Sequence, residues 1–498
     1  MPQDLTRVVV RGVGVSGAGY IATQALTIAV YLVLAHLLSP AEFGTFAAGS
    51  IVAGVGMLFA QSGMLSALIQ RRDRVDEAAD TALVATLVAG LLLGLVGQGL
   101  APLVGRFFGN HEATLVAAAM SGCVLVRQVA VVPDALLQRR FSFARRLVAE
   151  PLSIVAFGVT AIVAAQQGLG VWALVLGTYA ALTTHAVTAW AVVRWTPHPR
   201  RASFALWREL AAYGKHITGA EFLRWITVDS GALFVGRYLG LAQLGQYRLG
   251  YRIAARPFAA LVNSVTFVLF PAFARIADDE QRFRAALLRS LRWLSVIALP
   301  MSAIVLPLGE PVVVLLFGER WRQAGLVLTA TCAYTAGWAL VSLVEHVAKV
   351  ADRPDVVLRI YAFAGVAVVA LTAALVRVDL VAVGVALSLS ALAAAAYSFS
   401  WLVRITGIRS RVFLREIWPA TVSATAMAGV LLALDRLVLD AGSRSLVEGL
   451  ALVSLELVLG AVIYVVGMCV LAPATAGELI SRLAPAPSGS ARIKLEAR

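Results

Sequence analysis

The sequence predicts an all-α polytopic membrane protein with about 14 transmembrane helices, arranged as two parallel six-helix lobes followed by an appended C-terminal helix pair. Three observations support this prediction. Of the 498 residues, 60% are hydrophobic and only 14% are charged, and the mean hydropathy is +0.84, whereas a soluble protein has about 45–50% apolar and about 25% charged residues. Apolar stretches recur along almost the whole chain, and one short motif occurs twice, 201 residues apart.

Each apolar stretch is about twenty residues long, which is enough for a helix to cross a bilayer core of about 30 Å. The first follows MPQDLTRVVVRG and lacks the short apolar core and small-residue cleavage site of a secretory signal, so we interpret it as a retained span. The expected spans lie near residues 13–37, 44–68, 80–104, 113–137, 147–166, 171–193, 214–236, 247–271, 287–308, 322–348, 356–376, 380–403, 417–435 and 447–471.

The distribution of Lys and Arg predicts the orientation of these spans, because cytoplasmic loops collect basic residues. With the N-terminus inside, the inner segments hold 26 of the 42 basic residues and the outer loops hold 6. We therefore expect both termini to be cytoplasmic and the protein to lie in the cell inner (plasma) membrane.

The repeated motif predicts the arrangement of the lobes. LSPAEFGTF (38–46) is the expected outer turn between the first two spans, and LGLAQLGQY (239–247) is the expected turn between the seventh and eighth. Six spans separate the two copies, so both point the same way across the membrane, as in a parallel repeat. The expected parts are an N-terminal lobe (1–193), a cytoplasmic linker (194–213), a C-terminal lobe (214–404), helices 13 and 14 (405–471) and a disordered cytoplasmic tail (472–498).

Charge and cysteine content exclude several classes of protein. The net charge of +14 follows from Arg-rich inner loops and does not indicate nucleic acid binding. The three cysteines lie inside apolar stretches, so neither a disulfide framework nor a metal site is expected. We find no paired carboxylates, nucleophile triad or metal cluster in the sequence, so we expect no catalytic residues and no cofactor.

Several stretches resemble the Wzx-like polysaccharide flippases of the multidrug/oligosaccharidyl-lipid/polysaccharide (MOP) exporter superfamily. They are LSPAEFGTF, FAQSGMLSALIQRRD (59–73), GLGVWALVLG (168–177), VGRYLGLAQLGQYRLGYRI (235–253), VTFVLFPAFARI (265–276) and FGERWRQAG (317–325). The middles of the third, sixth and eleventh spans are almost purely aliphatic, and the C-terminal helix pair matches no such motif.

The resemblance implies two lobes around a central cavity that work by alternating access. It implies a polyprenyl-pyrophosphate-linked oligosaccharide as substrate, passed from the inner to the outer leaflet for cell-surface polysaccharide biosynthesis. The implied partners are the lipid bilayer and, downstream, a polysaccharide polymerase or glycosyltransferases.

Three arginines in the eighth expected span are candidates for binding that substrate. Arg248, Arg252 and Arg256 follow one another at intervals of four residues, so they share one helix face and descend from the outer rim toward the membrane centre. A charged side chain there should face a cavity or a partner, and a guanidinium matches phosphate oxygens in a bidentate manner. The alternative is that these side chains reach the interface or pair with acids elsewhere.

Two acids in the seventh expected span are candidates for coupling ion entry to reorientation. Glu221 has Arg224 three residues later and could simply pair with it, while Arg224 is also a candidate substrate ligand. Asp229 lies at nearly the depth expected for Arg252, so it is either half of a structural Asp229–Arg252 ion pair or a titrating acid. Arg127 has no acid within one helical turn, and we expect it to face the cavity.

Three other functions remain open at this stage. A multidrug exporter of the same superfamily usually needs acidic or neutral cavity groups, which the arginines disfavour. A flippase for the lipid-linked peptidoglycan precursor would also have fourteen spans and a cationic cavity. A membrane glycosyltransferase or polymerase would carry acids, His or Arg in sizeable outer loops, whereas the outer loops here are short.

Overall fold

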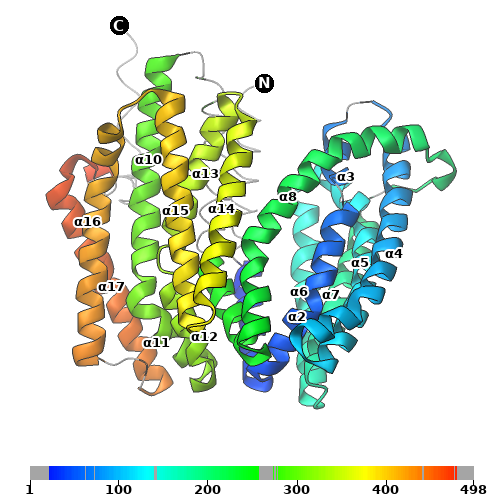
Figure 1. Cartoon of the computed structure of the whole chain (residues 1–498), viewed down its shortest axis with the longest axis horizontal. Coiled ribbons are helices and arrows are strands. Elements are labelled where there is room, and N and C mark those ends of the chain that lie inside the picture. Colours follow the sequence, from blue (N-terminus) through cyan, green and yellow to red (C-terminus); the bar gives the residue numbers. More distant parts are fainter. Residues whose placement is uncertain are drawn as a thin grey trace, which may run out of the picture. The chain divides into compact units, whose positions relative to one another are not determined.

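The computed structural model describes residues 22–256 and 279–478, apart from positions 62, 72, 140–142, 194, 440, 441, 443 and 476, and it also describes Phe273 and Ile276. The chain divides into two compact units. The first comprises Met1–Ile253, Leu316–Val327 and Leu358–Ser390, and the second comprises Ala254–Leu315, Leu328–Val357 and Ala391–Arg498. Within the described part the regular structure is helical and contains no strand (Figure 1).

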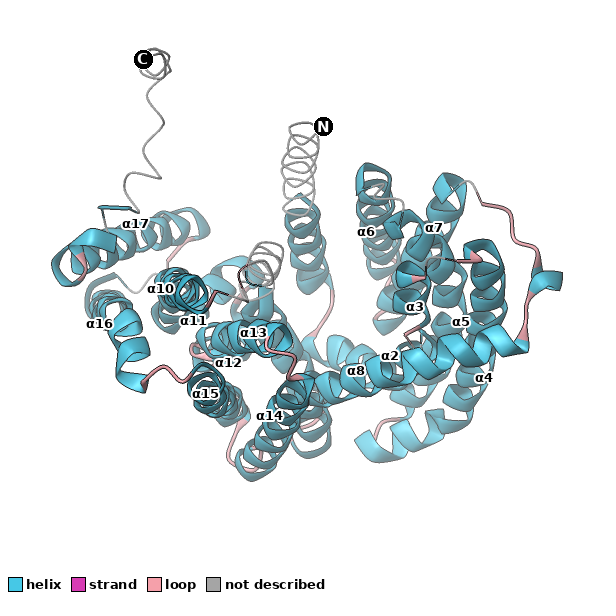
Figure 2. Cartoon of the chain, turned by 90° about the horizontal axis from the view of Figure 1, so that it is seen from above, coloured by secondary structure: helices cyan, strands magenta, loops and turns pink. Residues whose placement is uncertain are grey.

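The first unit begins with the helix Ala22–Leu37. It continues with α2 (Pro40–Gln61), α3 (Met64–Gln70), α4 (Val75–Phe108), α5 (His111–Arg139), α6 (Phe143–Gln166), α7 (Val171–Val193), the short 3₁₀ helix η1 (Pro199–Arg201) and α8 (Phe204–Tyr238). A further helix covers residues 241–256, and its residues up to Ile253 belong to this unit. Seen from above, α4, α5 and α7 stand side by side, and α5 packs against α2, α4 and α7 (Figure 2).

The second unit contains α10 (Glu280–Ala303), all but the last two residues of α11 (Val305–Phe317), α13 (Tyr334–Val350), α16 (Ser410–Leu434), the π-helix η3 (Asp435–Leu439) and α17 (Leu446–Leu471). α10 packs against α13 and α16, and α16 packs against α17. The 3₁₀ helix η2 (Glu319–Trp321) lies in the first unit, while α12 (Arg322–Ala330), α14 (Pro354–Leu375) and α15 (Leu380–Thr406) run across the boundary between the units.

The helices confirm the predicted fold class. Among the described residues, nine helices are long and apolar enough to cross a membrane, or eleven if each of two bent pairs counts as one span. α7 coincides with the expected span 171–193 at both ends. The helices at 22–37 and 241–256 border residues outside the described part, so the expected first and eighth spans are seen only in part.

Exposed apolar side chains show which helix faces meet lipid. On α4, Leu92, Leu95 and Val96 are each more than half exposed. In water such a contiguous apolar surface would be unfavourable, whereas in a bilayer it is the expected lipid-facing surface. α4 ends at Gly109, whose positive φ of 66° lets its N–H cap the carbonyl of Gly105.

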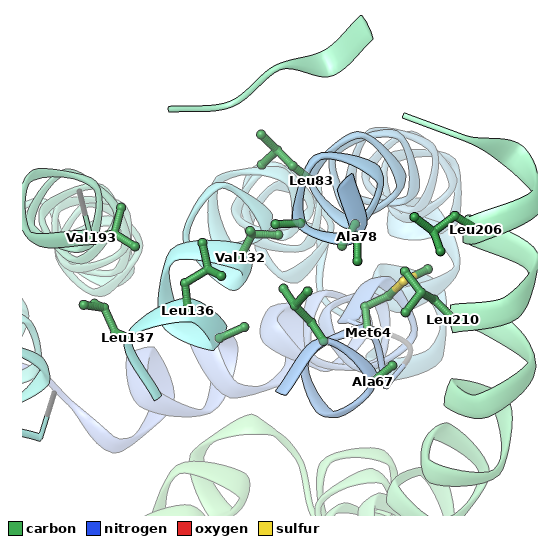
Figure 3. Close-up of a cluster of buried hydrophobic side chains, with 14 residues drawn as sticks. Met64, Ala67, Ala78, Leu83, Val132, Leu136, Leu137, Val193, Leu206 and Leu210 are labelled. Atoms are coloured by element: carbon green, nitrogen blue, oxygen red, sulfur yellow. The ribbon is translucent and has the colours of Figure 1, made fainter. Parts of the chain in front are cut away.

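α8 begins at Phe204, earlier than the start near residue 214 that we expected for the seventh span. Its first turns are held by burial: Leu206 and Leu210 pack on Met64 of α3 and Ala78 of α4 (Figure 3). Val132 and Leu136 of α5 belong to the same cluster. Polar residues lie between these leucines, so the length of the apolar stretch alone did not predict that the helix begins this early.

Two expected spans are bent helix pairs. α10 and α11 meet at an angle of 50°, shortly after Pro300 of α10. α12 and α13 meet at 43°. Proline removes a backbone hydrogen bond and displaces the preceding turn, which accounts for the first bend.

The two copies of the repeated turn lie against each other in the first unit. A Cβ atom on Gly44 would overlap the carbonyl of Leu241, and one on Gly245 would overlap the carbonyl of Pro40. Each added Cβ would also lie 3.1 Å from the backbone nitrogen of the other glycine. The contact is reciprocal at the offset of the repeat, as expected for a local two-fold relation. This supports a parallel duplication, while the lobe boundaries stay a prediction.

Aromatic side chains pack near the contact between Gly44 and Gly245 (the glycine crossing), against two backbone positions that the repeat makes equivalent. Phe108, at the end of α4, packs closely on Gly236 of α8. Trp321 of η2 is fully buried, and its indole N–H donates to the carbonyl of Ala35 at 3.0 Å. Ala35 and Gly236 are separated by the same 201 residues as the two glycines. The stretch FGERWRQAG, identified from resemblance, therefore positions the backbone at this crossing.

Candidate functional site

A cavity of about 290 Å³ opens in the first unit among the helix Ala22–Leu37, α2, α7, α8 and the helix over residues 241–256. Aromatic rings and a small set of charged groups line it. The lining residues are Tyr31, Phe43, Phe46, Ala47, Ser50, Ile51, Gly54, Leu174, Trp225, Asp229, Arg248, Leu249 and Arg252. The sequence had singled out three of these, namely Asp229, Arg248 and Arg252.

Arg252 is held over an aromatic ring. Its guanidinium carbon lies 4.2 Å from the ring centroid of Tyr31, which is close cation–π geometry. Tyr31 is itself fixed by a stacked contact with Phe157, whose centroid is 5.8 Å away, and by Phe43 at 6.3 Å. Arg252 is exposed, and no carboxylate of the described residues lies within ion-pair distance. Its edge N–H groups can therefore bind an anion.

Arg248, not Arg252, pairs with Asp229, so the predicted Asp229–Arg252 pair is wrong. Arg248 Nη1 donates to Asp229 Oδ1 at 2.6 Å, and the two side chains are 26% and 19% exposed. The depth estimate failed because α8 and the next helix are joined by a tight turn, which brings Asp229 level with the first arginine of the series. Tyr31 takes the place of an acid as the partner of Arg252.

Three other predicted site residues, Glu221, Arg224 and Arg256, do not line this cavity. Glu221 and Arg224 form the expected local pair at 2.6 Å, with side chains 45% and 60% exposed, and neither lines the cavity. Arg256 lies one turn beyond Arg252 on the same helix, is half-buried, and belongs to the second unit. The described cavity thus brings together two of the five predicted arginines.

Arg127 is paired and does not stand alone. Its Nη1 lies 3.1 Å from Asp134 Oδ2, two turns further along α5, and Nε2 of His185 on α7 lies 3.1 Å from the same carboxylate. The side chains of Arg127, Asp134 and His185 are 27%, 12% and 21% exposed. This triad links α5 to α7, and Arg127 does not line the cavity.

Replacing Asp134 with alanine should lower the free energy of unfolding by about 3–5 kcal/mol, because it leaves a guanidinium unpaired in a largely buried site. Unfolding of the detergent-solubilised protein would measure the change. Asp355→Ala is the matched control, since Asp355 pairs with Arg353 at an exposed position and such pairs contribute little. Equal losses for the two variants would show that the triad is not structural.

Sequence reasoning missed the aromatic part of the cavity. Tyr31 and Trp225 lie within apolar spans, where an aromatic residue is indistinguishable from a lipid-facing or core residue. Asp134 and His185 were also missed as partners of Arg127, because one is two turns away and the other comes from another helix. The sequence feature that could have pointed to Tyr31 as a cavity residue was its position near the outer end of the first expected span.

Comparison with known proteins places the chain in a family. The family profile described as "Polysaccharide biosynthesis protein" matches residues 33–325, more than half of the chain. The chain belongs to this family. The matched range includes the cavity residues from Phe43 to Arg252 and both copies of the repeated turn, but it excludes α16 and α17.

The chain is 30% identical over 329 residues to the succinoglycan biosynthesis transport protein ExoT of Rhizobium meliloti (strain 1021). The aligned region covers 66% of this chain and 66% of that relative, just under two thirds of either length.

Two solved structures show the same fold. The lipid II flippase MurJ, in an inward closed conformation, has a TM-score of 0.74 at 12% identity and covers 94% of this chain and 99% of its own. An inward-facing multidrug resistance MATE family transporter of the MOP superfamily has a TM-score of 0.60 at 17% identity, covering 77% and 95%. The family profile thus confirms the predicted kinship with polysaccharide biosynthesis proteins, and the two structures confirm the predicted fold. The chain is a multi-pass membrane protein.

Proposed function

We propose that this protein is a flippase that moves a polyprenyl-pyrophosphate-linked oligosaccharide from the inner to the outer leaflet for polysaccharide biosynthesis. The observation that carries the proposal is Arg252, which lies over Tyr31 at 4.2 Å and lines the cavity. Membership of a polysaccharide biosynthesis family supports the proposal, as does the similarity to a succinoglycan biosynthesis transport protein of Rhizobium.

The cavity suits the charged part of such a lipid. A pyrophosphate that crosses a low-dielectric core needs compensating positive charge, and Arg248, Arg252 and Asp229 together give the cavity a formal charge of about +1. Arg252 provides the first contact. Because the Arg248–Asp229 pair is partly exposed, phosphate oxygens can compete with the carboxylate for Arg248. The aromatic lining offers flat surfaces for sugar rings.

The other predicted residues keep secondary roles in this proposal. Arg256, Arg224 and Arg127 are candidates for later positions of the pyrophosphate during reorientation. Asp229 is the coupling candidate inside the cavity, since its protonation would release Arg248. Glu221 remains a weaker coupling candidate because Arg224 holds it locally.

The experiment that tests the function is reconstitution into proteoliposomes. We expect leaflet exchange of a polyprenyl-pyrophosphate-linked oligosaccharide and no exchange of the same glycan on a neutral lipid anchor. A cationic drug serves as the third substrate, because the basic cavity predicts that it is not moved. Transport of the cationic compound alone would favour the multidrug alternative. Exchange of a peptidoglycan precursor in preference to the oligosaccharide would favour the precursor flippase.

We also propose an N-in, C-in orientation in the inner membrane, on the basis of the excess of basic residues in the inner segments. Cysteines introduced at Ala41 and Gly442 should react with an impermeant reagent from outside, and a cysteine at Ser490 should react only after permeabilisation. Labelling of the Ser490 variant in intact cells would overturn the orientation. Polymerase and glycosyltransferase partners remain proposals that pull-down from the native membrane would test.

A further inference from the structure

The C-terminal helix α17 carries a buried acid that the proposed transport mechanism does not use. Glu456 has 0% of its surface exposed. Neither of its carboxyl oxygens has a hydrogen-bond partner among the described residues. An ionised carboxylate in such a place would cost several kcal/mol, so this group requires a specific explanation.

The packing of α16 on α17 places a second acid beside it. In these antiparallel helices Gly460 lies against Leu431 and Met427 of α16. One turn back along α17 is Glu456, and one turn on from Leu431 is Asp435, so the two acids are level. Asp435 is 9% exposed and acts electrostatically on Glu456. Figures 1 and 2 show the two helices side by side.

The local backbone sets this position apart from the rest of α16. Asp435 begins the π-helix η3, where the α-helical pattern of α16 stops. π-helical turns are rare and are frequent at functional sites. The π-helical turn therefore begins at the acid that lies level with the buried Glu456.

The surroundings leave few groups that could neutralise Glu456. Leu308 of α11 and Val453 of α17 form an apolar cluster, with Val312 and Leu315 packed against it. The charged groups on neighbouring elements are Asp435 and the exposed Arg436 of η3, the half-buried Glu310 of α11 and the exposed Glu448 at the start of α17.

We propose that Glu456 is a proton-binding site in the appended helix pair, with Asp435 as its acidic neighbour on α16. A negative charge nearby disfavours the ionised form of a buried carboxyl, and a proton needs only one oxygen, whereas a metal ion would need several more oxygen ligands than the described residues offer. On release, one carboxylic O–H bond breaks, the electron pair stays on the carboxylate, and the proton passes to water.

This site goes beyond the proposed function, since it lies outside residues 33–325, which match the family profile. It is also separate from the arginine cavity, which belongs to the other unit. Its test can therefore succeed or fail whatever lipid the protein carries.

Infrared difference spectroscopy of the full chain in detergent tests the site directly. Between pH 5 and pH 9 the wild type should show a protonated-carboxyl C=O band that Glu456→Gln abolishes or shifts. Glu448→Gln is the matched control, because Glu448 is an exposed acid on the same helix, and it should leave the band unchanged. A difference band identical in wild type and Glu456→Gln would overturn the proposal. So would a band that responds equally to sodium concentration, since that indicates a metal cation.

A second measurement covers the case in which one variant folds poorly. If Glu456 binds a proton in the folded protein, the unfolding temperature should fall as the pH rises through the deprotonation of Glu456. Glu456→Gln, and Asp435→Asn by removing the acidic neighbour, should each flatten this dependence, and Glu448→Gln should not. The same pH dependence in all four proteins would show that Glu456 holds no proton.

Discussion

Alanine at Gly44 or Gly245 should destabilise the protein strongly and abolish lipid exchange. At both positions the added methyl group meets a backbone carbonyl and not a flexible side chain, so the two helix starts must move apart. Overpacking of this kind typically costs about 1–3 kcal/mol. The loss would also remove the close backbone approach that small residues permit between membrane helices. Unfolding in detergent and lipid exchange in proteoliposomes would measure the two effects.

Because Gly44 and Gly245 contact each other, the variant with alanine at both positions gives a sharper test. Once one alanine has separated the helices, the second should cost much less, so the two losses should not add. Gly99→Ala is the control, since a Cβ there meets nothing within 4 Å, and it should leave stability unchanged or slightly higher. Fully additive losses at Gly44 and Gly245 would mean that the two glycines are not in contact.

Alanine at Arg252 should reduce lipid exchange by about a hundredfold or more, corresponding to about 3 kcal/mol for a lost charge-assisted contact with phosphate. Lysine should restore only part of the rate, because the forked geometry of the guanidinium is lost. The control is Arg377→Ala: Arg377 also lies over a tyrosine, with its guanidinium carbon 5.8 Å from the ring of Tyr238, but it lines no part of the cavity. Wild-type exchange by Arg252→Ala, or an equal loss in Arg377→Ala, would refute the assignment.

The sequence predicted the helical fold well because each span is specified locally. Apolar length alone identified α7 at both ends, and it located α5, α14, α15 and α17 to within a few residues. The prediction failed where tertiary contacts decide the outcome. α8 starts early because Leu206 and Leu210 are buried by other helices, and α10 separates from α11 at a bend that apolar length cannot show.

The site was predicted less completely for the same reason. Spacing placed Arg248 and Arg252 on one helix face, and both line the cavity. The partners of these arginines, Asp229 and Tyr31, come from other helices, so their pairing depended on register across a turn. The repeated glycines were visible as a motif, yet their mutual contact appears only in three dimensions.

The most direct test of the account is equilibrium binding of polyprenyl pyrophosphate, without its glycan, to the purified protein. The wild type and Arg377→Ala should bind with the same affinity, Arg252→Lys should bind more weakly, and Arg252→Ala should lose at least about tenfold, which corresponds to about 1.4 kcal/mol. Polyprenyl alcohol, which lacks the phosphates, should bind all four proteins alike. Unchanged affinity of Arg252→Ala for the pyrophosphate would contradict the claim that this cavity recognises the charged headgroup.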